Sequence, residues 1–147
     1  MCFICGVQNP VGLRMSVHND PDGRCVYSVV TVPDHFQSYP GVVHGGIVAT
    51  MLDEISGRAL LLSSDDNLMV TMKLGVKYRC PTPTHTPLKV VGRVLSMTET
   101  HAKVKGEIRL PDGTITAESE GLLARPPESM SARWESERPY WKVYPDT

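Results

Sequence analysis

The sequence lacks an excess of charge of either sign. Its 147 residues carry 15 Lys and Arg against 16 Asp and Glu, a formal net charge of −1 at pH 7. Proteins that bind nucleic acid or anionic membranes do so through a basic excess or a clustered basic patch. We therefore expect no nucleic-acid partner, and an anionic ligand would have to meet a local group of basic side chains.

Long hydrophobic runs are also missing. The apolar run Ala59–Leu62 is far shorter than the roughly 20 residues that cross a bilayer as a helix, so we expect no membrane span. Residues 5–14 hold prolines, glycines and polar residues where a secretory signal would need an apolar region, which makes the cytoplasm the expected location. An apolar fraction of 41% suits one globular domain with its own core.

Cysteine is scarce, with four in the chain. Cys2 and Cys5 have the Cys-x-x-Cys spacing of half a zinc site or of a redox pair. A second such pair is missing, and Cys25 and Cys80 are scattered. We therefore expect reduced free thiols, as is usual for cytosolic cysteines, with neither a bound metal nor a resident cofactor.

One stretch has the pattern of a long helix. Across residues 42–62 the apolar side chains recur with the i, i+3, i+4 spacing of a helix buried over most of its circumference. Gly45 and Gly46 lie in its first turn, where backbone N–H groups lack an intrahelical partner and a ligand oxygen can approach closely. Asp53 follows about two turns later, and a charge in so apolar a helix needs a partner or a task.

The spacing within this helix favours a two-fold dimer. At about 1.5 Å per residue, Gly45 and Asp53 are separated by roughly 12 Å along the axis, so one helix cannot bring both to the same carbonyl group. Two antiparallel copies can, because each Gly45 then lies near the other chain's Asp53. Glu54 follows directly, but a step of about 100° turns it toward a different surface, so Asp53 is the better candidate.

The remainder of the chain has the pattern of strands joined by turns. Residues 13–18 and 24–32 predict a hairpin around the turn at residues 19–23. Four further strands are expected at residues 68–79, 88–97, 102–110 and 114–124. One apolar helix with six strands predicts an α+β fold, in which a curved antiparallel sheet of about six strands wraps around one long central helix.

Two regions differ in character. Residues 1–125 make up the expected domain. Residues 126–147 open with two prolines and contain both tryptophans of the chain, Trp134 and Trp141. Because side chains of this size are highly buried on average, we expect the tail to dock on its own domain or on a partner subunit.

Three stretches carry a resemblance to a known family. They are Cys2-Phe3-Ile4-Cys5-Gly6 with Asn9-Pro10, His44-Gly45-Gly46 with Asp53, and Val76-Lys77-Tyr78-Arg79-Cys80-Pro81 after Val70-Thr71. Over roughly residues 2–125 the sequence resembles the hotdog-fold acyl-CoA thioesterases of the PaaI-like, or thioesterase superfamily member, group. Its most specific part is the His-Gly-Gly with an aspartate eight residues after the first glycine.

The resemblance implies hydrolysis of acyl-CoA thioesters to free acid and coenzyme A, which is then part of the substrate. Gly45 would donate its backbone N–H to the thioester carbonyl, and Asp53 of the opposite subunit would act as general base or as nucleophile. Thr71 would help to orient the attacking water. Gly46 would belong to the same site as the second glycine of the motif, and His44 would hold the loop before the helix or contact the thioester.

The resemblance also leaves alternatives open. Lys77, Arg79 and Arg125 are either contacts for the phosphates of coenzyme A or solvated surface charges. An acyl-thioester hydratase or dehydratase of the same fold is a second possible activity, and a non-catalytic acyl-CoA-binding module is a third function. The implied assembly is a homodimer or a dimer of dimers, and the identity of the acyl group stays open.

Overall fold

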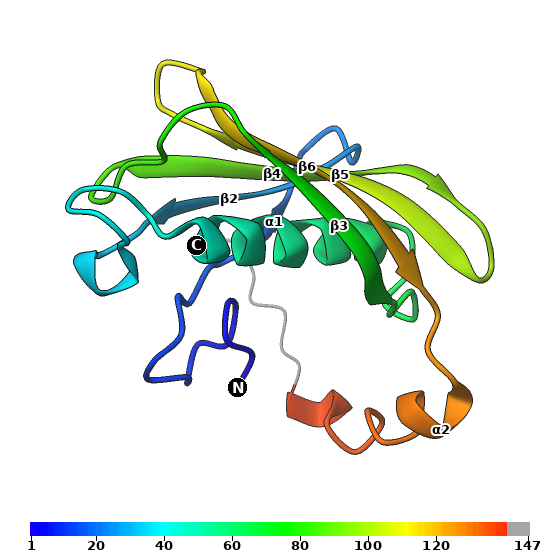
Figure 1. Ribbon diagram of the computed structural model, residues 1–147. Coiled ribbons are helices and arrows are strands. Elements are labelled where there is room, and N and C mark those ends of the chain that lie inside the picture. Colours follow the sequence, from blue (N-terminus) through cyan, green and yellow to red (C-terminus); the bar gives the residue numbers. More distant parts are fainter. Residues whose placement is uncertain (141–147) are drawn as a thin grey trace.

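The computed structural model describes residues 1–140. One helix, α1 (Gly45–Ala59), lies against a curved antiparallel sheet (Figure 1). Six strands follow the order β1-β2-β4-β5-β6-β3 across this sheet. Their bounds are β1 (His18–Asn19), β2 (Val26–Thr31), β3 (Val70–Tyr78), β4 (Pro87–Met97), β5 (His101–Arg109) and β6 (Ile115–Ala124). The predicted α+β architecture of a six-stranded sheet around one central helix is confirmed.

The helix is shorter than its apolar pattern predicts. Val42 and Val43 form isolated bridges to Pro83 and Gln37 and so belong to the loop before α1. The last turn continues as a 3-10 helix, η2 (Leu60–Leu62). The other short helices are η1 (Asp34–Phe36), α2 (Glu128–Ser131) and η3 (Arg138–Tyr140).

The face of α1 that meets the sheet is apolar and closed to solvent. Val48, Met51, Leu52, Ile55 and Ala59 are each at most 1% exposed. They recur at the helical spacing that the sequence shows, and they pack mainly over β4 and β5. Because burying one large aliphatic side chain contributes about 1.5–3 kcal/mol, this face holds α1 firmly on the sheet.

A row of small residues lets α1 approach the sheet closely. Gly92 of β4 is paired with Gly106 of β5, which is paired with Ser119 of β6. A β-carbon on Gly92 would overlap the backbone carbonyl of Ile55, and one on Gly106 would lie 2.8 Å from the Ser119 hydroxyl oxygen. The helix therefore sits where three neighbouring strands have almost no side chain.

Gly92→Ala is expected to lower the free energy of unfolding by about 1–3 kcal/mol, the range typical of overpacked cores. The reason is that the new methyl group meets backbone of α1, which cannot move aside without lifting the helix. Urea unfolding followed by far-UV circular dichroism measures the change. Gly75→Ala is the control, since a β-carbon there meets only the Glu120 carbonyl at 3.8 Å. Equal unfolding midpoints for Gly92→Ala and the unmodified protein would contradict this account of the close approach.

The strand expected at residues 13–18 is wrong for most of its length. β1 comprises only His18 and Asn19. Upstream of it, the N–H groups of Leu13 and Met15 donate to the carbonyls of Phe3 and Ile4, and Arg14 has a φ of 56°. A left-handed residue breaks the extended conformation, so this segment packs against the N-terminal loop instead of lengthening the hairpin.

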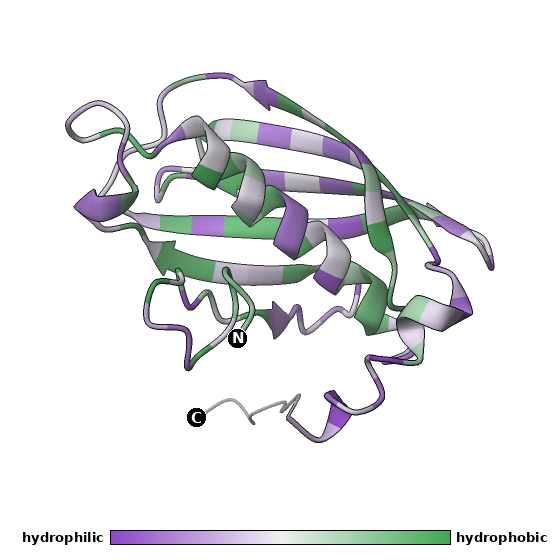
Figure 2. Cartoon of the chain, turned by 60° about the horizontal axis from the view of Figure 1, so that its bottom comes forward, coloured by the Kyte–Doolittle hydropathy of each residue, from purple (hydrophilic) through white to green (hydrophobic). Residues whose placement is uncertain are grey.

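The opposite face of α1 is open. Gly46, Thr50, Asp53 and Gly57 follow one another at helical spacing, and each is partly or fully exposed. Figure 2, seen from the helix side, shows hydrophilic residues in the middle of this face. The only charged side chain of the stripe, Asp53, therefore lies outside the closed contact between α1 and the sheet.

The C-terminal segment lies on the helix side of the sheet (Figure 1). Arg138 forms an ion pair with Asp66, with Nη2 3.3 Å from the carboxylate, and Trp134 is half-buried. Trp141 lies outside the described residues, so docking of residues 126–147 stays a prediction. No helix within residues 1–140 is long and apolar enough to cross a membrane.

Candidate active site

The first turn of α1 is closed by His44. Its ring Nδ1 accepts a hydrogen bond from the Gly46 N–H at 2.9 Å, and its carbonyl accepts from the N–H groups of Ile47 and Val48. His44 thus acts as the N-cap of the helix. Within residues 1–140 the Gly45 N–H has no acceptor. One backbone donor at the positive end of the helix dipole is left available for a ligand.

Tyr78 fixes the position of this donor. Its hydroxyl group, at the end of β3, donates to the Gly45 carbonyl at 2.6 Å. The sequence does not identify Tyr78 as a site residue, because its place among the apolar positions of the strand gives no sign that its hydroxyl reaches the helix. Sheet and helix are therefore joined directly at the start of α1.

Asp53 is paired with Thr71. The Thr71 hydroxyl, on β3, donates to Asp53 Oδ1 at 2.7 Å. Asp53 is half-buried, and the part of the chain that the structure describes offers no second partner for its carboxylate. The two predicted site residues are thus brought together, with one carboxylate oxygen held and the other free.

Glu54 points elsewhere. Its carboxylate accepts from Cys2 Sγ at 3.6 Å and pairs with Arg58 Nε at 3.2 Å. Beside it, burial and then the hydrogen bond and charge of Glu54 raise the pKa of Cys5 to about 12. A thiol this weakly acidic is a poor nucleophile at neutral pH, so the arrangement does not favour redox chemistry at this pair of cysteines.

A cavity of about 410 Å³ opens beside the start of α1. Its walls combine η1, the loop that follows it and the exposed side of the first helical turns. They are formed by His35, Phe36, Gln37, His44, Gly46, Ile47 and Thr50. The sequence alone does not reveal this cavity, because its shape depends on how residues 33–41 fold back on α1.

The three candidate phosphate contacts do not converge. Arg79 donates to the Glu118 carboxylate at 2.8 Å, and this bond raises the pKa of Arg79 and lowers that of Glu118. Arg125 donates to the carbonyls of Glu99 and Asp66 and follows the strand end that pairs with Val70. The length of β3, roughly 25 Å at about 3.3 Å per residue, separates it from Arg79. Only Lys77 and Arg79 lie at the Gly45 end.

Comparison with known proteins gives a consistent result. The family model described as "Thioesterase superfamily" matches residues 40–117, which contain His44, Gly45, Asp53 and Thr71. The Saccharolobus solfataricus protein named "Putative esterase SSO2140" is 32% identical over 111 residues, covering 74% of this chain and 76% of that protein. The Caenorhabditis elegans protein named "Putative esterase F42H10.6" is 31% identical over 102 residues, covering 69% of this chain.

A solved structure agrees with these relatives. Protein RHA08564, described as a thioesterase superfamily protein, superposes with a TM-score of 0.73 at 31% identity over 80% of this chain. The chain spans 60% of the length of the C. elegans protein and 59% of the solved chain. Since the family model matches more than half of its residues, the chain belongs to the thioesterase superfamily, with the hotdog fold that its sequence predicts.

Proposed function

We propose that this protein hydrolyses acyl-CoA thioesters to a free acid and coenzyme A. The observation that carries the proposal is the Gly45 N–H, which lacks an acceptor within residues 1–140 and points out of the first turn of α1. As water attacks a thioester, negative charge develops on its carbonyl oxygen. A fixed backbone donor at the positive end of a helix stabilises that charge.

Asp53 would supply the second group that hydrolysis needs. Thr71 holds Oδ1 at 2.7 Å, which orients the carboxylate and leaves its second oxygen free. That oxygen would remove a proton from water as general base, or it would attack the carbonyl carbon as nucleophile. In either role it must lie next to the carbonyl group that Gly45 binds.

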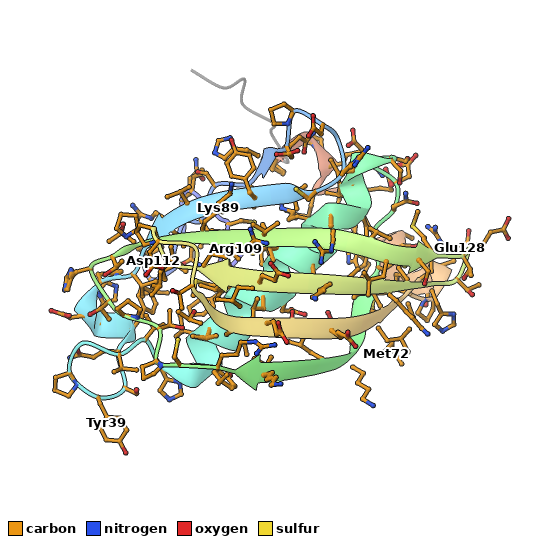
Figure 3. The ribbon with its side chains drawn as sticks, turned by 90° about the horizontal axis from the view of Figure 1, so that it is seen from above. Tyr39, Met72, Lys89, Arg109, Asp112 and Glu128 are labelled. Carbon is orange, nitrogen blue, oxygen red and sulfur yellow. The ribbon has the colours of Figure 1, made fainter. Side chains whose placement is uncertain are left out.

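A second copy of the chain would bring these groups together. β3 is the edge of the sheet, and Met72 and Tyr78 on it are 64% and 52% exposed. Met72 extends outward from this edge (Figure 3). Exposed strand edges with apolar side chains favour pairing with another strand, so β3 is the surface that we propose for dimerisation.

The register of such a pair can be worked out. If two copies of β3 pair antiparallel about Gly75, position 71 of one strand faces position 79 of the other, so the partner's Thr71 comes to lie one residue from the position opposite Tyr78. Tyr78 is bonded to Gly45, and Thr71 is bonded to Asp53. Asp53 of the partner subunit would therefore approach Gly45, across a helix face whose small residues permit close contact. Each dimer would hold two equivalent sites.

The test is release of free coenzyme A thiol from short, medium, long and aromatic acyl-CoAs. Hydrolysis of any of them supports the proposal and identifies the preferred acyl group. Binding of acyl-CoA without thiol release would favour a non-catalytic module instead. A hydratase would instead change the absorbance of an enoyl-CoA without releasing thiol. His44 Nδ1 accepts the bond from the Gly46 N–H, so such an activity would have to use Nε2 of that ring.

Thr71→Val is expected to lower kcat by roughly tenfold or more, since hydrogen bonds to charged groups contribute about 1.5–3 kcal/mol. The Asp53 carboxylate would remain but lose its fixed orientation, so KM should change little. Thr71→Ser keeps a hydroxyl group and is expected to restore most of the rate. Steady-state kinetics on the best substrate compares the three proteins, and a Thr71→Val variant with unmodified kcat would remove Thr71 from the mechanism.

A further inference from the structure

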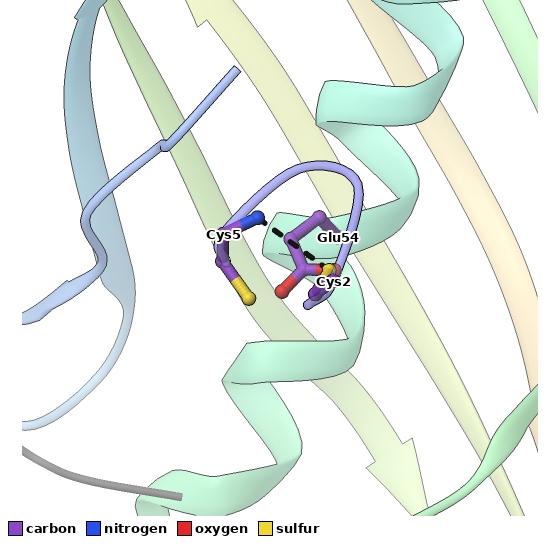
Figure 4. A group of neighbouring side chains, drawn as sticks. All are labelled: Cys2, Cys5 and Glu54. Carbon is purple, nitrogen blue, oxygen red and sulfur yellow. Dashed lines mark hydrogen bonds between the residues drawn. The ribbon is translucent and has the colours of Figure 1, made fainter. Parts of the chain in front are cut away.

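A cluster of side chains that can bind a metal ion lies next to the proposed site, on a different side of α1. Cys2 and Cys5 of the N-terminal loop converge there on Glu54 of the helix (Figure 4). One possible ligand atom from each residue lies within 4.8 Å of the other two. The sequence shows only the two cysteines and lacks a second pair, whereas the fold supplies a carboxylate from residue 54.

The N-terminal loop holds its sulfur atoms in a defined arrangement. Cys2 Sγ accepts the N–H groups of Ile4 and Cys5 at 3.4 and 3.5 Å. The Gly6 N–H donates to the Cys2 carbonyl at 3.0 Å, and a β-carbon at Gly6 would lie only 2.5 Å from that oxygen. The turn therefore requires glycine at its end, and its backbone donors point at a sulfur atom where they would stabilise a thiolate.

The loop is also anchored to the domain. Ile4, between the two cysteines, is 2% exposed and belongs to the main core. The buried side chain of Asn9 donates to the carbonyls of Met1 and Cys2 at 3.1 and 3.4 Å. These contacts fix the position of both cysteines relative to α1 before any ligand binds.

Arg58 completes the surroundings of the cluster. Its guanidinium group lies 3.5 Å from Cys5 Sγ and 3.2 Å from the Glu54 carboxylate. Two thiolates and a carboxylate around a divalent cation have a net charge of −1, which this arginine balances from outside. Such outer contacts orient metal ligands and tune the site.

We propose that Cys2, Cys5 and Glu54 bind a zinc ion. Sulfur and carboxylate ligands lie about 2.3 and 2.0–2.2 Å from zinc in a tetrahedral site, so that ligand atoms are roughly 3.5–4 Å apart. Cys2 Sγ and Glu54 Oε2 are already 3.6 Å apart. On binding, each thiol transfers its proton to solvent, and water occupies the fourth position. The ion would tie the N-terminal loop to the helix turn that carries Asp53.

Zinc analysis of the purified full-length protein tests this site. We expect about one zinc per chain. Metal-free protein should bind Co²⁺ and then show the near-ultraviolet absorption of cobalt–thiolate bonds. Cys2→Ser and Cys5→Ser should each weaken zinc binding by a hundredfold or more. Glu54→Gln keeps the shape of the side chain and both thiols, and it should weaken zinc binding by about tenfold or more. Cys25→Ser and Cys80→Ser are the matched controls and should keep the metal.

Several outcomes would overturn the proposal. They are metal-free protein that binds neither Zn²⁺ nor Co²⁺, a cobalt complex without thiolate absorption, or equal zinc affinity in Cys5→Ser, Glu54→Gln and the unmodified protein. Near-UV circular dichroism of each variant separates loss of the ligand from loss of the fold. None of these measurements uses thioester hydrolysis, so the result is independent of the proposed reaction.

Discussion

Asp53→Asn is expected to reduce kcat by roughly 10²–10⁴-fold, the range that a positioned general base contributes. The amide has nearly the shape of the carboxylate and can still accept the bond from the Thr71 hydroxyl, but it cannot take a proton from water or attack a carbonyl carbon. KM should change little, because the donor and the cavity at the start of α1 remain in place. Steady-state thiol release on the preferred acyl-CoA gives both constants.

The matched control is Asp65→Asn, which makes the same change at an exposed position in the loop after η2. It should keep the unmodified kcat. Sedimentation velocity and circular dichroism would show that both variants keep the fold and the oligomeric state. Unchanged turnover in Asp53→Asn would exclude Asp53 from the reaction and leave binding without catalysis as the better interpretation of the site.

Gly45→Pro is expected to lower kcat by roughly 10²–10³-fold, the loss typical of removing one oxyanion donor. Proline has no N–H, and the first position of a helix is where it is best tolerated. The preceding residue, His44, has φ −56° and ψ 135°, a conformation that proline allows. A β-carbon at position 45 would meet only Tyr78, with its ring and hydroxyl oxygen at an ordinary 3.6 Å. The change therefore removes the donor and retains the helix.

Gly45→Ala serves as its control, since it adds the β-carbon but keeps the N–H. It is expected to lose far less activity than Gly45→Pro. If both variants lose the same activity, crowding against Tyr78 would explain the effect and the donor would not. Far-UV circular dichroism shows whether α1 is intact in each.

The two inactive variants together test the shared site. If the chain forms the proposed two-fold dimer, coexpression of Gly45→Pro and Asp53→Asn chains in equal amounts makes half of the dimers mixed. In each mixed dimer one of the two sites combines an intact Gly45 with an intact Asp53, so about a quarter of the unmodified activity should return. No recovery would mean that each site is built from one chain.

Long elements with strong periodicity are the part of this fold that the sequence predicts well. α1 is recognised because its buried positions repeat every three or four residues, and β4, β5 and β6 because they alternate and end at turns. The strand predicted at residues 13–18 is wrong because the sequence there alternates as in a strand. The left-handed conformation of Arg14 and the hydrogen bonds to the N-terminal loop prevent the extended structure. Those bonds join residues whose proximity only the fold creates.

The residues of the candidate site also fall into a group that the sequence identifies and a group that only the fold reveals. The sequence identifies His44, Gly45 and Asp53 as candidate site residues because they lie in or next to one helix at a fixed spacing. Tyr78 and the walls of the cavity are not, because their contacts join β3 or the loop around η1 to α1. The contact between Glu54 and Cys2 likewise forms only when the N-terminal loop folds onto the helix, so the sequence does not predict it.

The walls of the cavity beside α1 come from two different parts of the molecule. His35, Phe36 and Gln37 come from the segment around η1, whereas Gly46, Ile47 and Thr50 stand on the core helix α1. Surface loops tolerate changes in sequence and length that a packed core does not. On the function proposed above, residues 33–41 would set which acyl group is accepted, and an engineer could exchange their exposed positions while the buried Phe36 and the groups on α1 and β3 stay in place.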